Sequence, residues 1–497
     1  MTRIITRKRT KPMKKNTLCL ILGAVLAAGV FSSFPASAEE NEKVYEDLNY
    51  TISESGEAVI TNCFQNATEC TVPEEIDGAP VTEIADSAFS ECYFLETVTV
   101  PDSVKIIGRQ AFSACSKLKS IKLPEEVEKM GAGVFDACPV LESVEMPKGL
   151  TELPEATFYE CEGLKTVKLQ EGLEVLGSES FYGCKSLSDI AFPESLTSID
   201  DYAFQGCQSL KKIKFTENVQ NLGKYIFQDC KSLEAIETDE NNEMFCSKDG
   251  VLFTKDGVTL VRYPEAIKND SFTVPEGCTQ LAAGSFTDAV HLKRIDMGSA
   301  TTYGMDVFFR CTGLESIAFP EGTTDISPSM FAYCSSMKSI DFPSTLKNIG
   351  DYAFYTCAAL TEVTVPEGTE KIGAYSFFNC IELKTLRLPD SITEIGDGAM
   401  GYYAQADDKE PEKLGGFTVE YGSNDVIYSF AEKYDLDGTG TGKSRLYIWI
   451  IAIGGAAVLI GVIVLIVILR RRAAIPRPVP GGRTGSAAKR PDPKKKG

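Results

Sequence analysis

A unit of 23 residues recurs along the chain, and residues 111–133 (AFSACSKLKSIKLPEEVEKMGAG) are one clear copy of it. Leu118, Ile121 and Leu123 have the L-x-x-I-x-L spacing of a short strand with one buried face. Pro124 ends this strand because proline cannot donate to a β-ladder. Each unit is too small to bury its own apolar side chains, so successive units must stack and share one core. The repeat predicts a β-rich solenoid of about twelve coils.

A cysteine occupies one equivalent position in eleven copies, with phenylalanine three residues before it and leucine or methionine three residues after it. Stacking would place the thiols above one another, so we expect them to act as small buried apolar groups of a structural ladder. Ala289 fills the position in one further copy, which favours reduced thiols. Disulfides between adjacent coils are the alternative. The ladder cysteines are Cys92, Cys115, Cys138, Cys161, Cys184, Cys207, Cys230, Cys311, Cys334, Cys357 and Cys380.

The regular spacing is interrupted once, between Cys230 and Ala289, which are 59 residues apart where two periods need 46. The 13 extra residues belong to an insertion at about residues 239–275. Asp256-Gly257 between two alternating apolar runs predicts a β-hairpin over 251–263. This hairpin is either part of an enlarged structural coil or a protrusion that contacts a ligand.

The array needs a cap at each end, since a terminal coil would otherwise expose its core. Residues 39–88 are predicted to form an N-terminal cap and first coil, and 89–403 the solenoid. Residues 404–436 are predicted to form a C-terminal cap with a strand at 417–421 and a helix at 425–434. A flexible linker is expected at 437–445. Cys63 and Cys70 lie off the ladder within the first cap and are candidates for a disulfide.

Both ends of the chain carry patterns typical of export and anchoring. Residues 1–38 combine seven basic residues, an apolar run and an Ala-Ser-Ala cleavage site, and are predicted as a signal peptide, with a retained anchor as the alternative. Residues 446–469 are uncharged and long enough for a transmembrane helix. The basic tail, 470–497, is expected in the cytoplasm near anionic lipids, which places 39–445 outside the cell.

Composition excludes several classes of function. The 497 residues include 70 acidic and 50 basic side chains and a single histidine, His291. Zinc sites with two histidines are impossible, and a Ser-His-Asp or Cys-His pair could be built only with His291. The net charge of −20 becomes −36 for residues 39–469 once the +7 of the signal and the +9 of the tail are set apart, which argues against a nucleic-acid partner. We expect no catalytic site, no cofactor and no metal.

The unit C-x-x-L-x-x-I-x-[LVF]-P-x-x-[VL]-x-x-[IL]-x-x-x-A-F resembles the BspA-like leucine-rich repeat family of bacterial surface proteins. The resemblance covers about residues 50–435, and a dozen copies in register make it specific. It implies a right-handed leucine-rich-repeat solenoid on the cell surface, linked to adhesion or partner binding, and it carries no catalytic residues.

The strand residues on either side of the buried Ile or Val should form an outward face. We expect a non-catalytic adhesion protein that binds an extracellular protein or glycan with this face. A structural envelope spacer is the first alternative, and a carboxylate-based surface enzyme is the last. Contact is expected beside the hairpin, where positive residues interrupt an acidic segment. The candidate ligand-binding residues are Lys212, Lys214, Arg262, Tyr263, Arg294 and Arg387.

Overall fold

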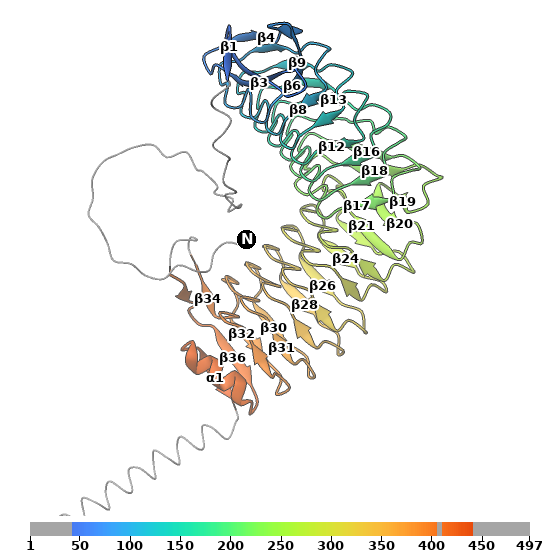
Figure 1. Cartoon of the computed structure of the whole chain (residues 1–497). Helices are drawn as coiled ribbons and strands as arrows, with labels where there is room; N and C mark the ends of the chain where they lie inside the picture. The colour runs from blue at the N-terminus through green and yellow to red at the C-terminus, as the bar shows by residue number, and fades with distance from the viewer. Residues whose placement is uncertain (1–41, 405–409, 441–497) are drawn as a thin grey trace, which may run out of the picture. The chain divides into compact units, whose positions relative to one another are not determined.

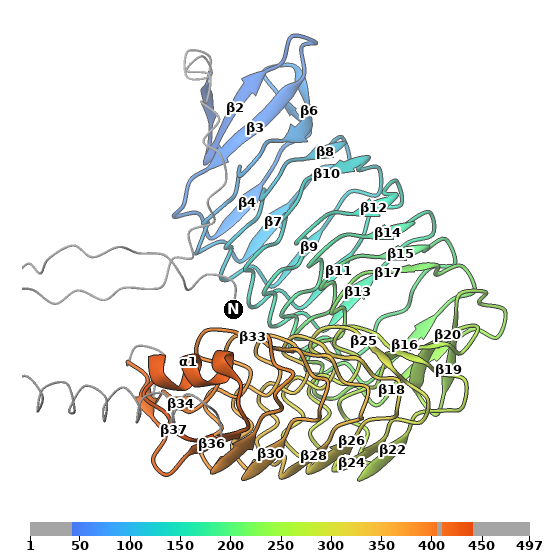
Figure 2. The same cartoon turned by 90° about the horizontal axis from the view of Figure 1, so that it is seen from below.

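The structure is a computed structural model that describes residues 42–404 and 410–440. Short β-strands dominate this part of the chain, and they stack coil upon coil (Figure 1). A regular coil contributes a strand of three or four residues and, farther along, a strand of two residues. Strands of successive coils lie side by side and parallel, as Figure 2 shows, and form what we call the long-strand ladder and the short-strand ladder.

The long-strand ladder repeats in a register of 23 residues, so that Val98 lies opposite Ile121 and Val144 opposite Val167. Residues 189–191 take the equivalent place without strand geometry. The strands are β4 (Glu69–Thr71), β7 (Thr97–Thr99), β9 (Ser120–Lys122), β11 (Ser143–Glu145), β13 (Thr166–Lys168), β16 (Lys212–Phe215), β18 (Ala235–Thr238), β22 (Ser271–Thr273), β24 (Arg294–Asp296), β26 (Ser316–Ala318), β28 (Ser339–Asp341), β30 (Glu362–Thr364), β32 (Thr385–Arg387), β36 (Thr418–Tyr421) and β37 (Asp437–Gly440).

The short-strand ladder keeps the same register, with Leu176 opposite Ile199. A glycine often follows the strand because the preceding coil comes very close: a Cβ at Gly223 would lie 2.3 Å from the backbone nitrogen of Asp201. The strands are β6 (Ala79–Ile84), β8 (Ile106–Ile107), β10 (Lys129–Met130), β12 (Glu152–Leu153), β14 (Val175–Leu176), β15 (Ser198–Ile199), β17 (Asn221–Leu222), β21 (Thr259–Arg262), β23 (Gln280–Leu281), β25 (Thr302–Tyr303), β27 (Asp325–Ile326), β29 (Asn348–Ile349), β31 (Lys371–Ile372) and β33 (Glu394–Ile395).

The solenoid is confirmed, but it has about 16 turns, so the expectation of about twelve coils is wrong. The additional turns are those of β4, β22, β36 and β37, which lie in the caps and in the insertion. At the equivalent positions these turns lack the phenylalanine and cysteine that mark the regular copies, and both backbone pairing and other buried side chains bring them into the stack.

The core consists of side chains stacked at equivalent positions. The rings of Phe181 and Phe204 lie 5.1 Å apart and 4° from parallel, and those of Phe331 and Phe354 lie 5.3 Å apart. All eleven ladder cysteines are buried free thiols. They do more than fill space, because each thiol donates a hydrogen bond to a backbone carbonyl of an earlier coil.

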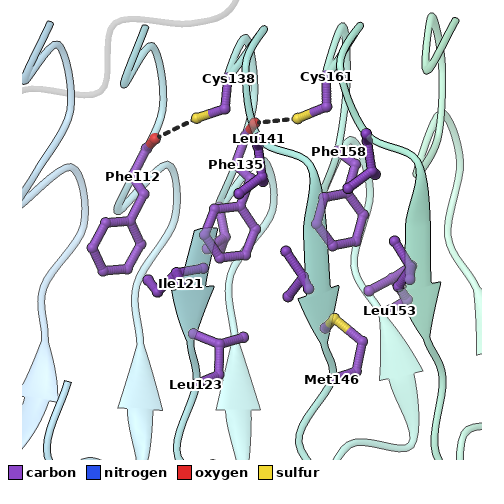
Figure 3. Close-up of a cluster of buried hydrophobic side chains, with 14 of the residues drawn as sticks. Phe112, Ile121, Leu123, Phe135, Cys138, Leu141, Met146, Leu153, Phe158 and Cys161 are labelled. Atoms are coloured by element: carbon purple, nitrogen blue, oxygen red, sulfur yellow. Dashed lines mark hydrogen bonds between the residues drawn. The ribbon is translucent and has the colours of Figure 1, made fainter. Parts of the chain in front are cut away.

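The thiol hydrogen bond repeats from coil to coil. Cys138 Sγ donates to Phe112 O at 3.1 Å and Cys161 Sγ to Phe135 O at 3.0 Å (Figure 3). The same donor and acceptor positions, 26 residues apart, recur for Cys115, Cys184, Cys207, Cys230, Cys334, Cys357 and Cys380. Cys311 bonds Phe286 O, and Cys92 bonds the carbonyl of Cys63 over a longer distance.

The N-terminal cap is an antiparallel sheet joined to the first coils. Strands β1 (Lys43–Tyr45), β2 (Leu48–Ile52) and β3 (Ala58–Cys63) pair antiparallel, and β3 pairs parallel with β6. Strand β5 (Glu75–Ile76) forms a hairpin with β6. Cys63 and Cys70 are buried free thiols in this structure. They lie in hydrogen-bond contact, and this contact raises the pKa of the Cys63 thiol to about 12.

The C-terminal cap contains the helix α1 (Asp425–Lys433), and the Asn424 side chain accepts hydrogen bonds from the first-turn backbone. Strands β34 (Tyr402–Tyr403) and β35 (Glu412–Lys413) pair antiparallel beside it. The prediction of a linker from 437 onward is wrong for residues 437–440, because β37 pairs parallel with β36. Gly438 and Gly440 were the reason for expecting a flexible linker. In the structure, the absence of a side chain at these two positions lets the Tyr421 ring pack against the strand.

Within the described residues, no helix is both long and apolar enough to cross a membrane. The predicted signal peptide at 1–38, the transmembrane helix at 446–469 and the basic tail at 470–497 lie outside the described residues.

Candidate binding face

Side chains at the first and third positions of the long strands point outward, and those at the middle position are buried in most strands and partly buried in β22 and β28. In β16, Lys212 and Lys214 are exposed while Ile213 is buried. We call the surface formed by these outward side chains the strand face. Its alternation follows from the two-residue period of a strand.

Two shallow hollows lie on the strand face. One is lined by residues between 120 and 170 and has a volume of about 240 Å³; the other is lined by residues between 189 and 239 and has a volume of about 290 Å³. Nine of the ten positions that line the first hollow have a counterpart three repeats later among the positions that line the second. The corresponding pairs include Ser120 and Asp189, Leu123 and Phe192, Glu125 and Glu194, Glu145 and Lys214, Pro147 and Thr216, and Gln170 and Asp239.

Each hollow combines an apolar floor with charges of both signs. The hollow at 120–170 is lined by Lys122, Glu125 and Glu145, and the Lys168 ammonium, which is outside its lining, donates a hydrogen bond to Glu145 and lowers the pKa of that carboxyl. In the hollow at 189–239, Lys212 pairs with Glu237 at 3.4 Å. Among the described residues no ion pair engages Lys214. The hollows can therefore hydrogen-bond polar groups of a ligand while its apolar parts contact the floor.

The four predicted cationic positions on the strand face are not equivalent. Lys212 and Lys214 line the same hollow. Arg294 is exposed on β24, beyond the insertion. Arg387 is held between Glu362 at 3.1 Å and Glu420 at 2.7 Å, and these carboxylates raise the pKa of its guanidinium. Its charge is thus matched within the protein.

Arg262 and Tyr263, predicted as ligand-binding residues beside the hairpin, are not on the surface. Arg262 is 7% exposed and Tyr263 1% exposed. The Arg262 guanidinium donates to Glu265 at 2.8 Å and to two backbone carbonyls, those of Phe227 and Gly284. A buried guanidinium needs such partners, so Arg262 serves the packing of the insertion.

The insertion is an enlarged coil, not a free protrusion. Strands β19 (Phe245–Lys248), β20 and β21 pair antiparallel in sequence, with β20 at Val251–Thr254. The predicted hairpin of β20 and β21 is present, but Val251, Phe253 and Leu260 are buried in it. The hairpin contributes buried side chains to both hydrophobic core clusters, Leu252 to one and Val251, Phe253 and Leu260 to the other, which favours the structural alternative.

A repeat was hidden within the insertion. The Tyr263 ring stacks on Phe286 at 5.1 Å and so occupies the phenylalanine position of a coil. Ala266 takes the cysteine position, and β22 follows at the regular spacing. Searching for Tyr-x-x-Ala followed by a polar–apolar–polar triplet at the spacing of the regular copies would have found it.

A family comparison accounts for this architecture. The model of the BspA type leucine rich repeat region matches six copies, over residues 47–165, 82–187, 151–249, 263–361 and 347–405, which is more than half of the chain. The chain belongs to the BspA-type leucine-rich repeat family. Proteins of the BspA type are generally bacterial surface proteins of a non-catalytic repeat class. The BspA-type match stops at 249 and resumes at 263, where the hairpin of β20 and β21 lies.

Solved structures show the same fold. A leucine-rich cell surface protein of Faecalibacterium prausnitzii is 24% identical, with a TM-score of 0.57 over 75% of this chain and 97% of that one. A leucine-rich repeat protein of Bacteroides ovatus is also 24% identical, with a TM-score of 0.52 over 80% and 99%. The pneumococcal vaccine antigen PcpA is 21% identical, with a TM-score of 0.50 over 81% and 97%. No curated protein matches the chain significantly.

The described residues contain no group of three or more His, Cys, Asp or Glu side chains that could hold a metal ion. Four carboxylates of the strand face, Glu145, Glu237, Glu362 and Glu420, are paired with lysine or arginine of a neighbouring coil.

Proposed function

We propose that this BspA-type protein is a non-catalytic surface protein that binds a repeating protein or glycan chain along its strand face. The observation that carries the proposal is the recurrence of one hollow, in the same register, three coils away. With neighbouring strands about 4.8 Å apart, the hollows repeat after roughly 14 Å. A polymer with repeating units could occupy both at once.

The chemistry of the hollows favours a polar ligand. Carboxylates such as Glu125 and Glu194 can accept hydrogen bonds from hydroxyl or amide groups, and Lys214 can donate to an acceptor. Within the hollows the floor is apolar but holds only one aromatic side chain, Phe192. Affinity at one hollow should therefore be modest, and simultaneous contact with both should raise it.

The proposed function includes the location of the protein. We place the described part outside the cell as a right-handed solenoid, after removal of 1–38. Residues 446–469 would anchor it, and the tail at 470–497 would face anionic lipids in the cytoplasm. The signal, apolar and basic patterns of the sequence support this arrangement.

Cells displaying the full chain test the proposal on surfaces coated with glycans and peptides of graded length. Polymers long enough to reach both hollows should retain cells at least about tenfold better than fragments that fill one. Lys214→Glu should weaken retention, because it removes the unpaired cation of one hollow. Lys224→Glu carries the same charge change in the same coil but lies off the strand face, and should not weaken it. If no coated surface retains the cells above those lacking the protein, the envelope-spacer alternative is favoured.

A further inference from the structure

The turn that precedes the insertion lacks its regular neighbour. In the preceding coil, the N–H groups of Tyr202 and Phe204 donate to Lys224 O and Ile226 O of the coil that follows. The equivalent donors one repeat later are Tyr225 and Phe227. Among the described residues no backbone carbonyl accepts from either of them. The insertion displaces the coil that would have supplied these acceptors.

A third N–H group of this turn, that of Asp229, does have an acceptor. The N–H of Asp229, two residues after Phe227, donates to the carboxylate of Glu265. This carboxylate comes from the insertion and takes the place of the missing carbonyl. An oxygen of the same kind would satisfy the two remaining donors, because backbone N–H groups that lie together favour anionic acceptors.

A cavity of about 310 Å³ lies beside these two donors. Its walls are mainly apolar and come from both sides of the interruption, including Leu222, Phe227, Phe245, Leu252 and Val261. This volume is at the lower end of the range of small-molecule sites, which are mostly apolar with a few polar groups in fixed places.

The charge of the cavity is unusual for so acidic a chain. Lys224 and Arg262 are among its lining residues, whereas no aspartate or glutamate is. Arg262 is paired with Glu265, which is not one of the residues that line the cavity. No ion pair among the described residues engages the Lys224 ammonium. The residues that line the cavity therefore include one cation without an ion pair and, at Tyr225 and Phe227, two backbone N–H groups without a backbone acceptor among the described residues.

Two side chains hold the walls apart without filling the cavity. The Tyr225 hydroxyl donates to Asp306 at 2.8 Å, across the interruption. Its ring passes over Gly284, where a Cβ would lie 3.0 Å from the ring. Arg262 bonds carbonyls on both sides, Phe227 O at 2.9 Å and Gly284 O at 2.6 Å. These hydrogen bonds fix the walls of the cavity before a ligand binds, which reduces the entropy lost on binding.

We propose that this cavity binds a small carboxylate with an apolar body. Its carboxylate would accept from the N–H groups of Tyr225 and Phe227 and lie near Lys224, and its apolar body would contact Leu222, Phe245 and Leu252. The site is independent of the strand face.

The probes that test this site are hydrocinnamate and the neutral hydrocinnamyl alcohol, which share one apolar body. Both are titrated into the purified full chain and followed by saturation-transfer NMR and calorimetry. Hydrocinnamate should bind at least about tenfold more tightly than the alcohol, the factor expected from hydrogen bonds to a charged group. Lys224→Glu should abolish this preference, and Ala282→Phe should fill the cavity and remove binding of both probes.

Lys214→Glu is the matched control, since it makes the same charge change on the strand face and should leave both affinities unchanged. Thermal unfolding shows whether Ala282→Phe folds, and Lys224→Glu, at an exposed position, keeps the test valid if it does not. The proposal is overturned by no binding to the wild-type chain, by equal affinity for the alcohol, or by unchanged affinities in Lys224→Glu. None of these results bears on the polymer site, which Lys214→Glu tests separately.

Discussion

At the scale of the residue, the ladder cysteine is a packing group that also donates a hydrogen bond. Cys207 is fully buried, and its thiol bonds Phe181 O at 3.2 Å. Burial raises the pKa of this thiol far above its ordinary range, so it stays protonated and remains a donor. The position tolerates alanine at Ala289, which shows that the weak thiol bond is not essential to a coil.

Substitutions in one coil should separate ring stacking from the thiol bond. Phe204→Ala removes a ring stacked between two others and should cost about 3–5 kcal/mol of unfolding free energy. Cys207→Ala should cost only about 1–2 kcal/mol, because it loses a weak hydrogen bond and a small volume. Denaturant unfolding measures both. Equal losses would show that the thiol contributes more than packing and one weak bond.

Glu265 should make the stability of the insertion depend on pH. Burial raises its pKa from an ordinary 4.5 to about 7, although Arg262 opposes the shift. The folded chain therefore binds this proton more tightly than the unfolded chain, and unfolding free energy is lost as the pH rises from 4.5 to 7. Relative to Glu265→Gln, which cannot ionise, the wild type should lose on the order of 2 kcal/mol across this window. A constant difference between the two proteins would contradict the assignment.

At the scale of the element, regular strands could be predicted from the sequence, whereas irregular coils could not. The strand at 120–122 was evident because Leu118, Ile121 and Leu123 carry its apolar pattern. Strand β37 has the sequence Asp-Gly-Thr-Gly, which lacks such a pattern and forms through backbone pairing with β36. Likewise, Tyr263 and Ala266 replace the two residues by which a coil was detected.

The pairing of β37 should depend on the absence of a side chain at Gly440. A Cβ there would lie 2.7 Å from the Tyr421 ring, so Gly440→Ala should weaken the last coil by about 1–3 kcal/mol. Hydrogen exchange at the backbone of β36 and β37 should accelerate in this variant. Gly415→Ala is the control, since a Cβ at Gly415 meets no atom within 4 Å. Unchanged exchange in Gly440→Ala would show that the ring moves aside freely.

At the scale of the whole molecule, the candidate hollows required the structure. Their linings join side chains from successive coils, and their recurrence after three repeats depends on which positions carry large or charged groups. The sequence indicated Lys212 and Lys214 correctly as outward groups of one strand. It could not show that Arg387 is matched by two carboxylates of other coils, or that Arg262 is buried against the carbonyls of Phe227 and Gly284, which are distant in sequence.

Protease treatment of intact cells should test the proposed orientation. It should remove the part that contains residues 43–440 and leave a small membrane-bound fragment with the basic tail. Antibodies against each part would measure this. Protection of the solenoid in intact cells, with cleavage only after the membrane is opened, would contradict an external location.

The direction of the thiol hydrogen bonds has a consequence for the order in which the coils fold during synthesis or export. From Cys115 onward, each thiol reaches back to a carbonyl of the coil before it, 26 residues earlier in most copies. A coil that has just left the ribosome or an export channel thus finds the acceptor of its thiol already in place, whereas the N–H groups of its turn are satisfied only when the next coil supplies its carbonyls. Assembly can proceed vectorially from the amino terminus, with the β1–β3 sheet as the template on which the first coil is laid. A stalled chain would then end in a folded array with one open end.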